Sequence, residues 1–137
     1  MASTGNLSVV AANQCADAQF GGQAFTPPAT LYATIFTTVP TTANVGGVEA
    51  TGGSYARVAV TNNLTSFPAA VSGAKTNGTD IVFVTTGITP GTALGVGFYD
   101  QSVGGNLRGV STLATASPYV AGGTLKIVAG ALAISVI

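Results

Sequence analysis

The chain has 137 residues with four basic and four acidic side chains, a formal net charge of zero and no histidine. Ordinary globular domains carry about 25% charged residues, against 6% here. Either partner chains cover much of the surface, or Thr, Ser, Asn and Gly keep the chain in solution, and assembly is the first hypothesis. The neutral balance disfavours nucleic-acid binding. A single cysteine, Cys15, without any histidine excludes a zinc site built from these two residue types.

The length is that of one domain of common size. The C-terminal apolar stretch, residues 127–137, is shorter than the ~20 residues needed to cross a bilayer. The N-terminus lacks the basic segment of a signal peptide. We therefore expect a single domain that is made in a cytoplasm and is not embedded in a membrane.

The first predicted element is a short helix within residues 7–20. Apolar side chains recur there at roughly helical spacing, Ser8 can cap the N-terminus, and Gly21 can adopt the positive φ that often follows a helix. Prolines 27 and 28 then impose extended backbone. We expect residues 1–28 to form an N-terminal arm that holds this helix, and residues 29–137 to form a β-domain.

The composition and spacing of residues in the rest of the chain are typical of β-structure. Short runs rich in Val, Ile, Thr, Phe and Tyr are separated by Gly, Pro and Asn at intervals of about ten residues, which is typical of a β-sandwich or barrel. We therefore predict an all-β fold, a β-sandwich or jelly-roll-like barrel. The predicted strands span residues 31–38, 55–61, 80–85, 94–99, 106–113, 124–128 and 131–137, and the run 80–85 is apolar enough for burial on both faces.

Two polar, Gly-rich stretches, residues 41–53 and 66–78, are predicted to be long loops. Loops of this length in a compact domain are commonly functional or are ordered by a partner. We therefore place the candidate partner contacts in these loops, at Thr41, Asn44, Lys75 and Asn77.

The charged residues suggest structural features rather than catalysis. Glu49 and Arg57 flank a glycine pair, and we interpret Arg57 as paired with a carboxylate across a strand. The alternative, an acid and a base around a substrate, is disfavoured because no second group would titrate near neutral pH. Asp100 precedes two glycines and is typical of a turn cap, and no other carboxylate is near enough in sequence for a calcium site. We predict no catalytic residue, no metal and no cofactor.

Five segments together resemble a family of small tailed-bacteriophage virion proteins, some labelled tail fibre proteins and some capsid decoration, or cement, proteins. These motifs are turn and strand signatures, and the similarity runs nearly end to end. The resemblance implies a structural β-protein without catalytic residues. The segments are TPPATLYATIFTT (26–38), VEATGGSYARVAV (48–60), NNLTSFPAA (62–70), KTNGTDIVF (75–83) and GFYDQSVGGNLRGVSTL (97–113).

Together with the low charge, this resemblance implies a cement protein that is made in the host cytoplasm, binds the outer surface of the capsid and stabilises it. The implied partners are the major capsid protein and further copies of the chain in a homotrimer. The alternative is a tail fibre or tail-associated protein with a host-surface binding role, in which tyrosines could stack on glycans. A small hydrolase is a third alternative, disfavoured by the missing histidine. The candidate stacking residues are Tyr32, Tyr55, Tyr99 and Tyr119.

Overall fold

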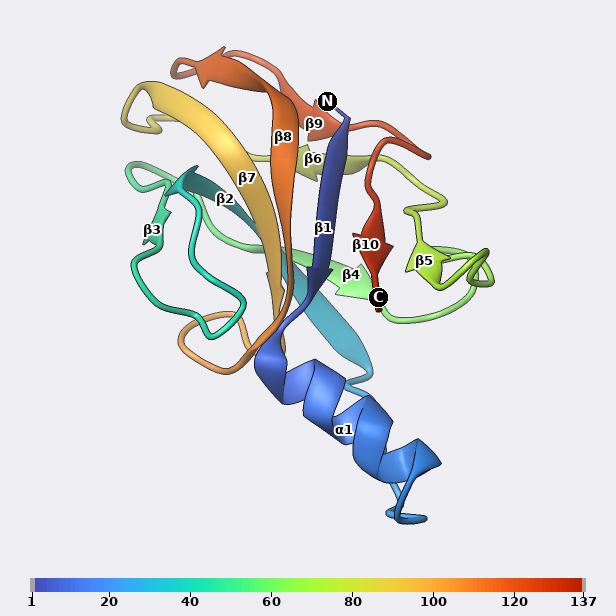
Figure 1. Ribbon diagram of the computed structural model, residues 1–137. Helices are drawn as coiled ribbons and strands as arrows, with labels where there is room; N and C mark the ends of the chain where they lie inside the picture. Colours follow the sequence, from blue (N-terminus) through green and yellow to red (C-terminus); the bar gives the residue numbers. More distant parts are fainter. Residues whose placement is uncertain (1, 137) are drawn as a thin grey trace.

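The computed structural model describes residues 2–136 and is mainly β, in a sandwich-like arrangement with one helix near the N-terminus (Figure 1). The predicted all-β sandwich with a short N-terminal helix is therefore confirmed. The elements are β1 (Ser3–Leu7), α1 (Val9–Gln19), β2 (Thr30–Thr38), β3 (Val48–Glu49), β4 (Val58–Thr61), β5 (Ala74–Lys75), β6 (Ile81–Phe83), β7 (Gly91–Tyr99), β8 (Leu107–Tyr119), β9 (Leu125–Ile127) and β10 (Ile134–Ser135).

A large curved sheet has the strand order β3-β2-β7-β8-β1-β10-β5, with β4 also paired to β2, and a small second sheet consists of β6 and β9. The centre of the large sheet is the antiparallel set β2, β7 and β8. The first of these, TLYATIFTT, is rich in β-branched and aromatic residues, which favour extended backbone. It pairs with β7 from Tyr32 opposite Tyr99 to Phe36 opposite Gly95. The predicted hairpin between β7 and β8 is also present.

The N-terminal strand β1 lies inside this sheet. It runs antiparallel to β8 and parallel to β10, so that Gly5 pairs with Ser111 on one side and with Ile134 on the other. The prediction that residues 1–28 lie outside the β-domain misses this strand. Its sequence, STGNL, has neither the β-branched run nor the apolar alternation of a typical strand, and its two distant partners hold it extended.

Hydrophobic residues pack on both faces of the large sheet. On the inner face, β2, β7 and β8 pack against the β6 and β9 sheet in one large cluster that includes Ile35, Val96 and Phe98. On the outer face, a smaller cluster consists of Phe36, Tyr99, Leu107 and Val110. Gly97 makes this outer cluster possible, because a Cβ at this position would lie 2.4 Å from Cε2 of Phe36. Such a close approach of a neighbouring group is a common reason for a glycine inside a strand.

Several predicted strands have different bounds in the structure. The run 80–85 shortens to β6, where Ile81 and Phe83 are buried and Val82 is exposed, so the expectation of burial on both faces is wrong. The small sheet packs one face on the core and turns the other outward. The run 55–61 begins only at Val58, whereas β8 continues past residue 113 to Tyr119. The two predicted loops, 41–53 and 66–78, contain the two-residue strands β3 and β5.

Both predicted caps of the helix are confirmed. The hydroxyl oxygen of Ser8 accepts a hydrogen bond from the N–H of Ala11 at 3.1 Å, and Gly21 beyond the helix end has a positive φ. The buried face is much smaller than the helical spacing predicts, because Ala11 is the one residue of α1 that is buried. Within residues 2–136, no helix is long and apolar enough to cross a membrane.

The base of α1 is held against the sheets, but its far end is not. The N–H of Ser8 donates to the carbonyl oxygen of Arg108, and the N–H of Val9 donates to that of Thr42, each at 2.9 Å. From this base, α1 projects away from the sheets (Figure 1). We call α1 together with the segment that returns to β2, residues 20–29, the helical arm.

Candidate functional site

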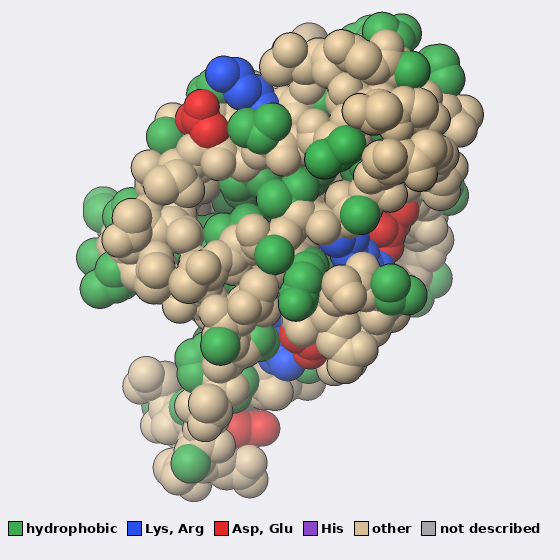
Figure 2. All heavy atoms as spheres, turned by 180° about the vertical axis from the view of Figure 1, so that it is seen from behind, with side chains coloured by type: hydrophobic (Ala, Val, Ile, Leu, Met, Phe, Trp, Pro, Cys, Tyr) green, Lys and Arg blue, Asp and Glu red, His purple; other side chains and the backbone are tan. Residues whose placement is uncertain are grey.

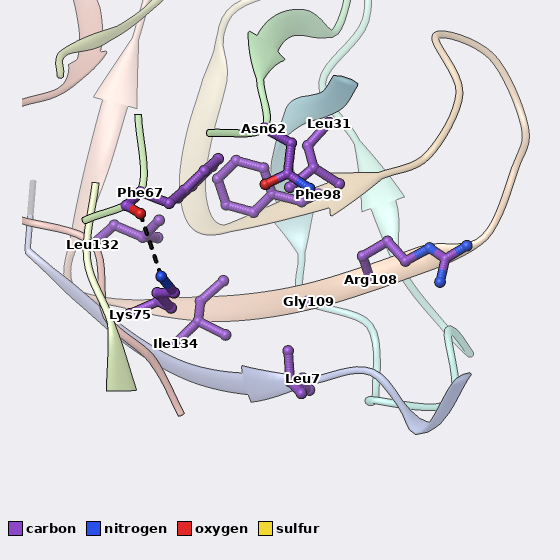
Figure 3. Close-up of a pocket in the computed structure, with 10 residues that line it drawn as sticks. All are labelled: Leu7, Leu31, Asn62, Phe67, Lys75, Phe98, Arg108, Gly109, Leu132 and Ile134. Carbon is purple, nitrogen blue, oxygen red and sulfur yellow. Dashed lines mark hydrogen bonds between the residues drawn. The ribbon is translucent and has the colours of Figure 1, made fainter. Parts of the chain in front are cut away.

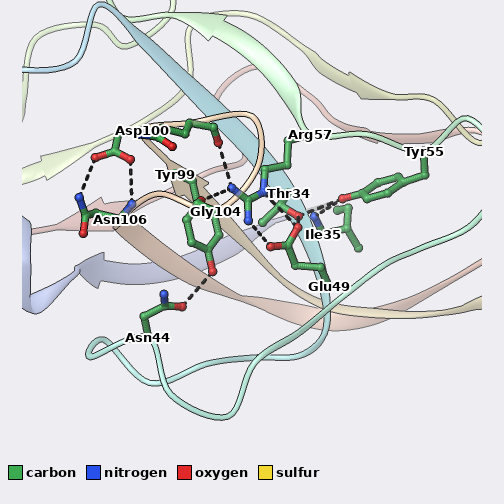
Figure 4. Close-up of polar contacts among 11 residues, drawn as sticks. Thr34, Ile35, Asn44, Glu49, Tyr55, Arg57, Tyr99, Asp100, Gly104 and Asn106 are labelled. Atoms are coloured by element: carbon green, nitrogen blue, oxygen red, sulfur yellow. Dashed lines mark hydrogen bonds and ion pairs between the residues drawn. The ribbon is translucent and has the colours of Figure 1, made fainter.

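A polar cluster, consisting of Thr34, Glu49, Tyr55, Arg57 and Tyr99, lies on the outer face of the large sheet (Figure 4). Nε of Arg57 donates to Oε2 of Glu49 at 3.1 Å, and Nη2 donates to Oε1, so the ion pair is bidentate. The hydroxyl of Thr34 also donates to Oε2 of Glu49, at 2.8 Å. The predicted pairing of Arg57 with a carboxylate is therefore confirmed.

Arg57 also holds the hairpin loop between β7 and β8. Its Nη1 donates to the carbonyl oxygens of Gln101 at 2.9 Å and of Gly104 at 2.7 Å. Its guanidinium carbon lies 3.7 Å from the ring centroid of Tyr99, a cation–π geometry. One side chain thus ties together β3, the hairpin loop and the end of β7.

Tyr55 fills a gap in the edge of the large sheet. β4 pairs with β2 up to Ala33 and β3 begins to pair at Phe36, so between these two residues β2 has no strand partner on this edge. The Tyr55 hydroxyl accepts a hydrogen bond from the N–H of Ile35 at 2.9 Å and lies 3.0 Å from the Thr34 hydroxyl. Burial raises the pKa of Tyr55 above 10.0, so the phenol remains protonated at neutral pH.

Asp100 closes the same hairpin loop from the other side. Its Oδ1 accepts the N–H of Asn106 at 2.8 Å, and its Oδ2 pairs with Nη2 of Arg108 at 2.9 Å. Burial alone would raise the pKa of Asp100, but the hydrogen bonds from Asn106 and Arg108 outweigh burial and hold the pKa below 3.8. The turn-cap interpretation is confirmed, with the partner six residues on rather than two. Arg108 also donates to Oε1 of Gln14, which links α1 to this loop.

Beside the polar cluster runs an open groove of about 670 Å³, lined by residues 47–52, residues 55–57 and residues 102–104. Of the four candidate stacking tyrosines, Tyr55 alone is among the residues that line it. Tyr99 and Tyr119 are buried, so their rings are not accessible to a glycan. The groove therefore presents valine and alanine side chains as well as backbone and hydroxyl groups, while its two charged side chains are engaged with each other.

The ionisable side chains of the polar cluster are engaged in hydrogen bonds. Both oxygens of Glu49 accept hydrogen bonds from Arg57, and the Tyr55 hydroxyl is bound to the backbone. Across residues 2–136, no three side chains of His, Cys, Asp or Glu are grouped closely enough to hold a metal ion. What the cluster does is hold three loop segments in fixed positions around the groove.

A second hollow, of about 140 Å³, lies near the base of the helical arm, and its lining spans the neighbouring strands β2, β7, β8 and β1 (Figure 3). We call it the apolar mouth. The rings of Phe67 and Phe98 pack edge-to-face in it, with centroids 5.6 Å apart. Its apolar lining is Leu7, Leu31, Phe67, Phe98, Leu132 and Ile134, and the polar side chains of Asn62, Lys75 and Arg108 also line it.

The apolar mouth was not predicted, because its lining is assembled from segments that lie far apart in the sequence. Leu7 and Ile134, for example, come from strands near opposite ends of the chain. The one sequence signal was the apolar character of the individual residues, which does not reveal that they share a surface.

The four predicted partner contacts have different surroundings. Thr41 and Asn44 are exposed, and Asn44 Oδ1 accepts a hydrogen bond from the Tyr99 hydroxyl at 2.9 Å. Lys75 lies at the apolar mouth, where Nζ donates to the carbonyl oxygens of Phe67 and Pro68.

The assignment of Asn77 as a partner contact is wrong. Its side chain is buried, with 2% of the residue exposed. The amide nitrogen donates to the carbonyl oxygens of Thr79 and Val128, and the amide oxygen accepts the N–H of Leu132. Every hydrogen bond here is internal, so Asn77 joins the loop 66–78 to the chain before β10 and is not free to contact a partner.

The fold and these sites define a mainly β structural protein. Its charged side chains hold loops in place, and its helical arm is largely exposed to solvent. A family model described as podophage GP4 fiber I protein gp80 matches residues 6–135. The chain therefore belongs to this family and is a structural protein of the phage virion, as the resemblance implied. No curated protein matches the chain.

Proposed function

We propose that the protein is a subunit of a virion fibre or of its attachment point, that it works by binding neighbouring chains, and that it has no catalytic activity. The family description supports the fibre assignment. The observation that carries the proposal is the helical arm, an eleven-residue helix of which only Ala11 is buried. Most helices in proteins are stabilised by packing of an apolar face, and this helix makes little such packing within its own chain.

The proposed partners are other copies of this chain, in a homotrimer, and a larger virion component. Neither nucleic acid nor a membrane is a proposed partner, because the net charge of zero supplies no attractive field for either. In a fibre tip, the open groove beside the polar cluster would face the host surface and bind a polar ligand through hydroxyl and backbone groups.

Capsid decoration is the second candidate function, with the major capsid protein as partner and the capsid surface as location. The observation that favours it is the loop 41–47, which is exposed and carries no charged side chain. A neutral polar loop can dock many copies on a lattice without long-range repulsion. Under either candidate, we expect synthesis in the host cytoplasm.

Immunogold electron microscopy of intact virions, with an antibody raised against this chain, separates the two candidates. Gold on fibres or at their attachment point is the expected result. Gold spread evenly over the head would reject the fibre assignment and establish decoration. Virions that lack the chain by gene deletion provide the control for antibody specificity.

A further inference from the structure

The charged side chains of this protein pair almost completely within the chain. Glu49 pairs with Arg57, Asp100 with Arg108, and Asp80 with Lys126. Two side chains have no ion-pair partner among residues 2–136, namely Asp17 and Lys75. These two have opposite charges, and Figure 2 shows how thinly charges are spread over one face of the molecule.

Asp17 lies near the tip of the helical arm, beside the most exposed large hydrophobic side chain among the described residues. Phe20, three residues further on, is 89% exposed. Phe20 is the C-cap residue of α1 and directly follows Gln19. The tip therefore presents an aromatic ring and a carboxylate together.

Lys75 lines the apolar mouth, and its charge is opposite to that of the Asp17 carboxylate. The mouth is a hollow of about 140 Å³ lined mainly by leucine, isoleucine and phenylalanine side chains. Nζ of Lys75 donates two hydrogen bonds, to the carbonyl oxygens of Phe67 and Pro68. An ammonium group has three N–H donors, so one donor remains for a carboxylate.

We propose that the helical arm of one copy docks on the apolar mouth of a second copy, with Phe20 in the mouth and Asp17 paired with Lys75. The arm carries an exposed apolar side chain and an unpaired acid, and the mouth supplies an apolar hollow and an unpaired base. In its own chain, the arm points away from the sheets, so its tip does not occupy its own mouth (Figure 1).

This contact joins two different surfaces, so each copy binds one neighbour through its helical arm and another through its apolar mouth. Contacts of this head-to-tail kind close into a ring when the rotation between copies allows it. The inference rests on the homo-oligomer of the proposed function, and three copies would complete the proposed trimer. It does not depend on where in the virion the oligomer is placed.

The test measures association by sedimentation of the purified chain over a range of concentrations. Phe20→Ala should weaken association about tenfold or more, as expected for an aromatic anchor in a pocket. The matched control is Val120→Ala, which also truncates an exposed apolar side chain but at the end of β8, outside the mouth; it should leave association unchanged. An oligomer unaffected by Phe20→Ala would overturn the inference, as would a wild-type chain that remains monomeric at all concentrations.

Charge reversal tests the second part of the contact. Asp17→Lys and Lys75→Glu should each weaken association, and the double variant should recover most of the loss, because the pair is restored with its signs exchanged. Asp17 is exposed, so Asp17→Lys should fold normally even if Lys75→Glu does not. Absence of any effect from Asp17→Lys would reject the assigned ion pair.

Cross-linking identifies the occupant of the mouth. In a Cys15→Ser background, one copy carries Gln19→Cys, next to the anchor Phe20, and the other carries Asn62→Cys, a residue that lines the mouth. A disulfide-linked heterodimer is expected on mixing and oxidation. Failure of that cross-link in an oligomeric sample would place another surface in the mouth and overturn the inference. A single chain that carries both cysteines and cross-links to itself at high dilution would also overturn the inference, because the arm would then occupy the mouth of its own chain.

Neither result changes where immunogold places the protein, so failure here is distinct from failure of the fibre proposal.

Discussion

At the residue scale, Arg57 joins more separate segments than any other charged side chain described here. It contacts Glu49 in β3, two carbonyl oxygens of the hairpin loop and the ring of Tyr99. Its side chain is 9% exposed. Removing one member of such a largely buried pair leaves the other charge without a partner, which is the costly case.

We predict that Arg57→Ala lowers the free energy of unfolding by about 3 kcal/mol. Urea denaturation monitored by circular dichroism measures the loss. The matched control is Lys126→Ala, which removes an ion pair whose side chains are 43% and 45% exposed and whose charged atoms are 3.7 Å apart. That exposed pair should contribute about 0.5 kcal/mol or less. Equal losses in the two variants would show that Arg57 does not fasten the loops.

Asp100 makes the stability of the hairpin loop depend on pH. The pKa of Asp100 is below 3.8 in the folded chain, so the folded state favours the charged form. Its contribution to stability is therefore complete above the ordinary pKa and is lost as the pH falls through the lowered folded value. Asp100→Asn removes the charge and keeps the shape.

The wild type should be more stable than Asp100→Asn at neutral pH, and the two should converge as the pH falls below 3.8. Urea unfolding of both proteins from about pH 7 to about pH 2 measures the difference. A difference that stays constant through the acid range would mean that the carboxylate charge contributes nothing to folding.

At the element scale, β1 depends on the absence of a side chain at Gly5. A Cβ there would lie 1.9 Å from the carbonyl oxygen of Val110 and 2.4 Å from Cα of Ser111, both in the backbone of β8. A backbone contact cannot be relieved by rotating a side chain, so β1 and β8 would have to separate.

Gly5→Ala should therefore destabilise the protein by about 3 kcal/mol, at the upper end for overpacking. Thr4→Ala is the matched control, because Thr4 lies next in the same strand and is exposed, and it should cost about 0.5 kcal/mol or less. Hydrogen exchange of the β1 amides measures whether the strand is released. Full protection of β1 in Gly5→Ala would contradict the close contact.

The elements that the sequence predicts well are those with strong local signals. The aromatic and β-branched run of β2, the turn after Tyr99 and the caps at Ser8 and Gly21 all match. Each depends on a few neighbouring residues, and its conformation is favoured locally.

The missed elements depend on distant partners. STGNL forms β1 only between β8 and β10, and the two-residue strands β3 and β5 exist only where a neighbouring strand meets them. The same is true of the sites. The Glu49 and Arg57 pair was predictable because eight residues separate its members, whereas the apolar mouth joins residues from both ends of the chain.

At the scale of the whole molecule, the helical arm and the sheets should respond separately to proteolysis. Residues 20–27 are exposed and include Phe20 and Phe25, which chymotrypsin accepts. We predict first cleavage after one of these residues. The two fragments should stay together until denaturant is added, because β1 is paired on both sides.

Native gel filtration followed by mass spectrometry distinguishes the outcomes. Early cleavage within the sheets, or immediate release of the N-terminal fragment, would contradict the description of an arm that protrudes from an intact sheet. Slower cleavage at high protein concentration would be expected if association covers the arm.

The position of β1 also determines when the protein can finish folding. Gly5 is synthesised long before its strand partners, Ser111 and Ile134. Contacts between residues so far apart in sequence form slowly, because a long loop must close first. The large sheet therefore stays incomplete until β8 and β10 have been synthesised, and during that time both edges of β1 are open to pairing with a neighbouring nascent chain.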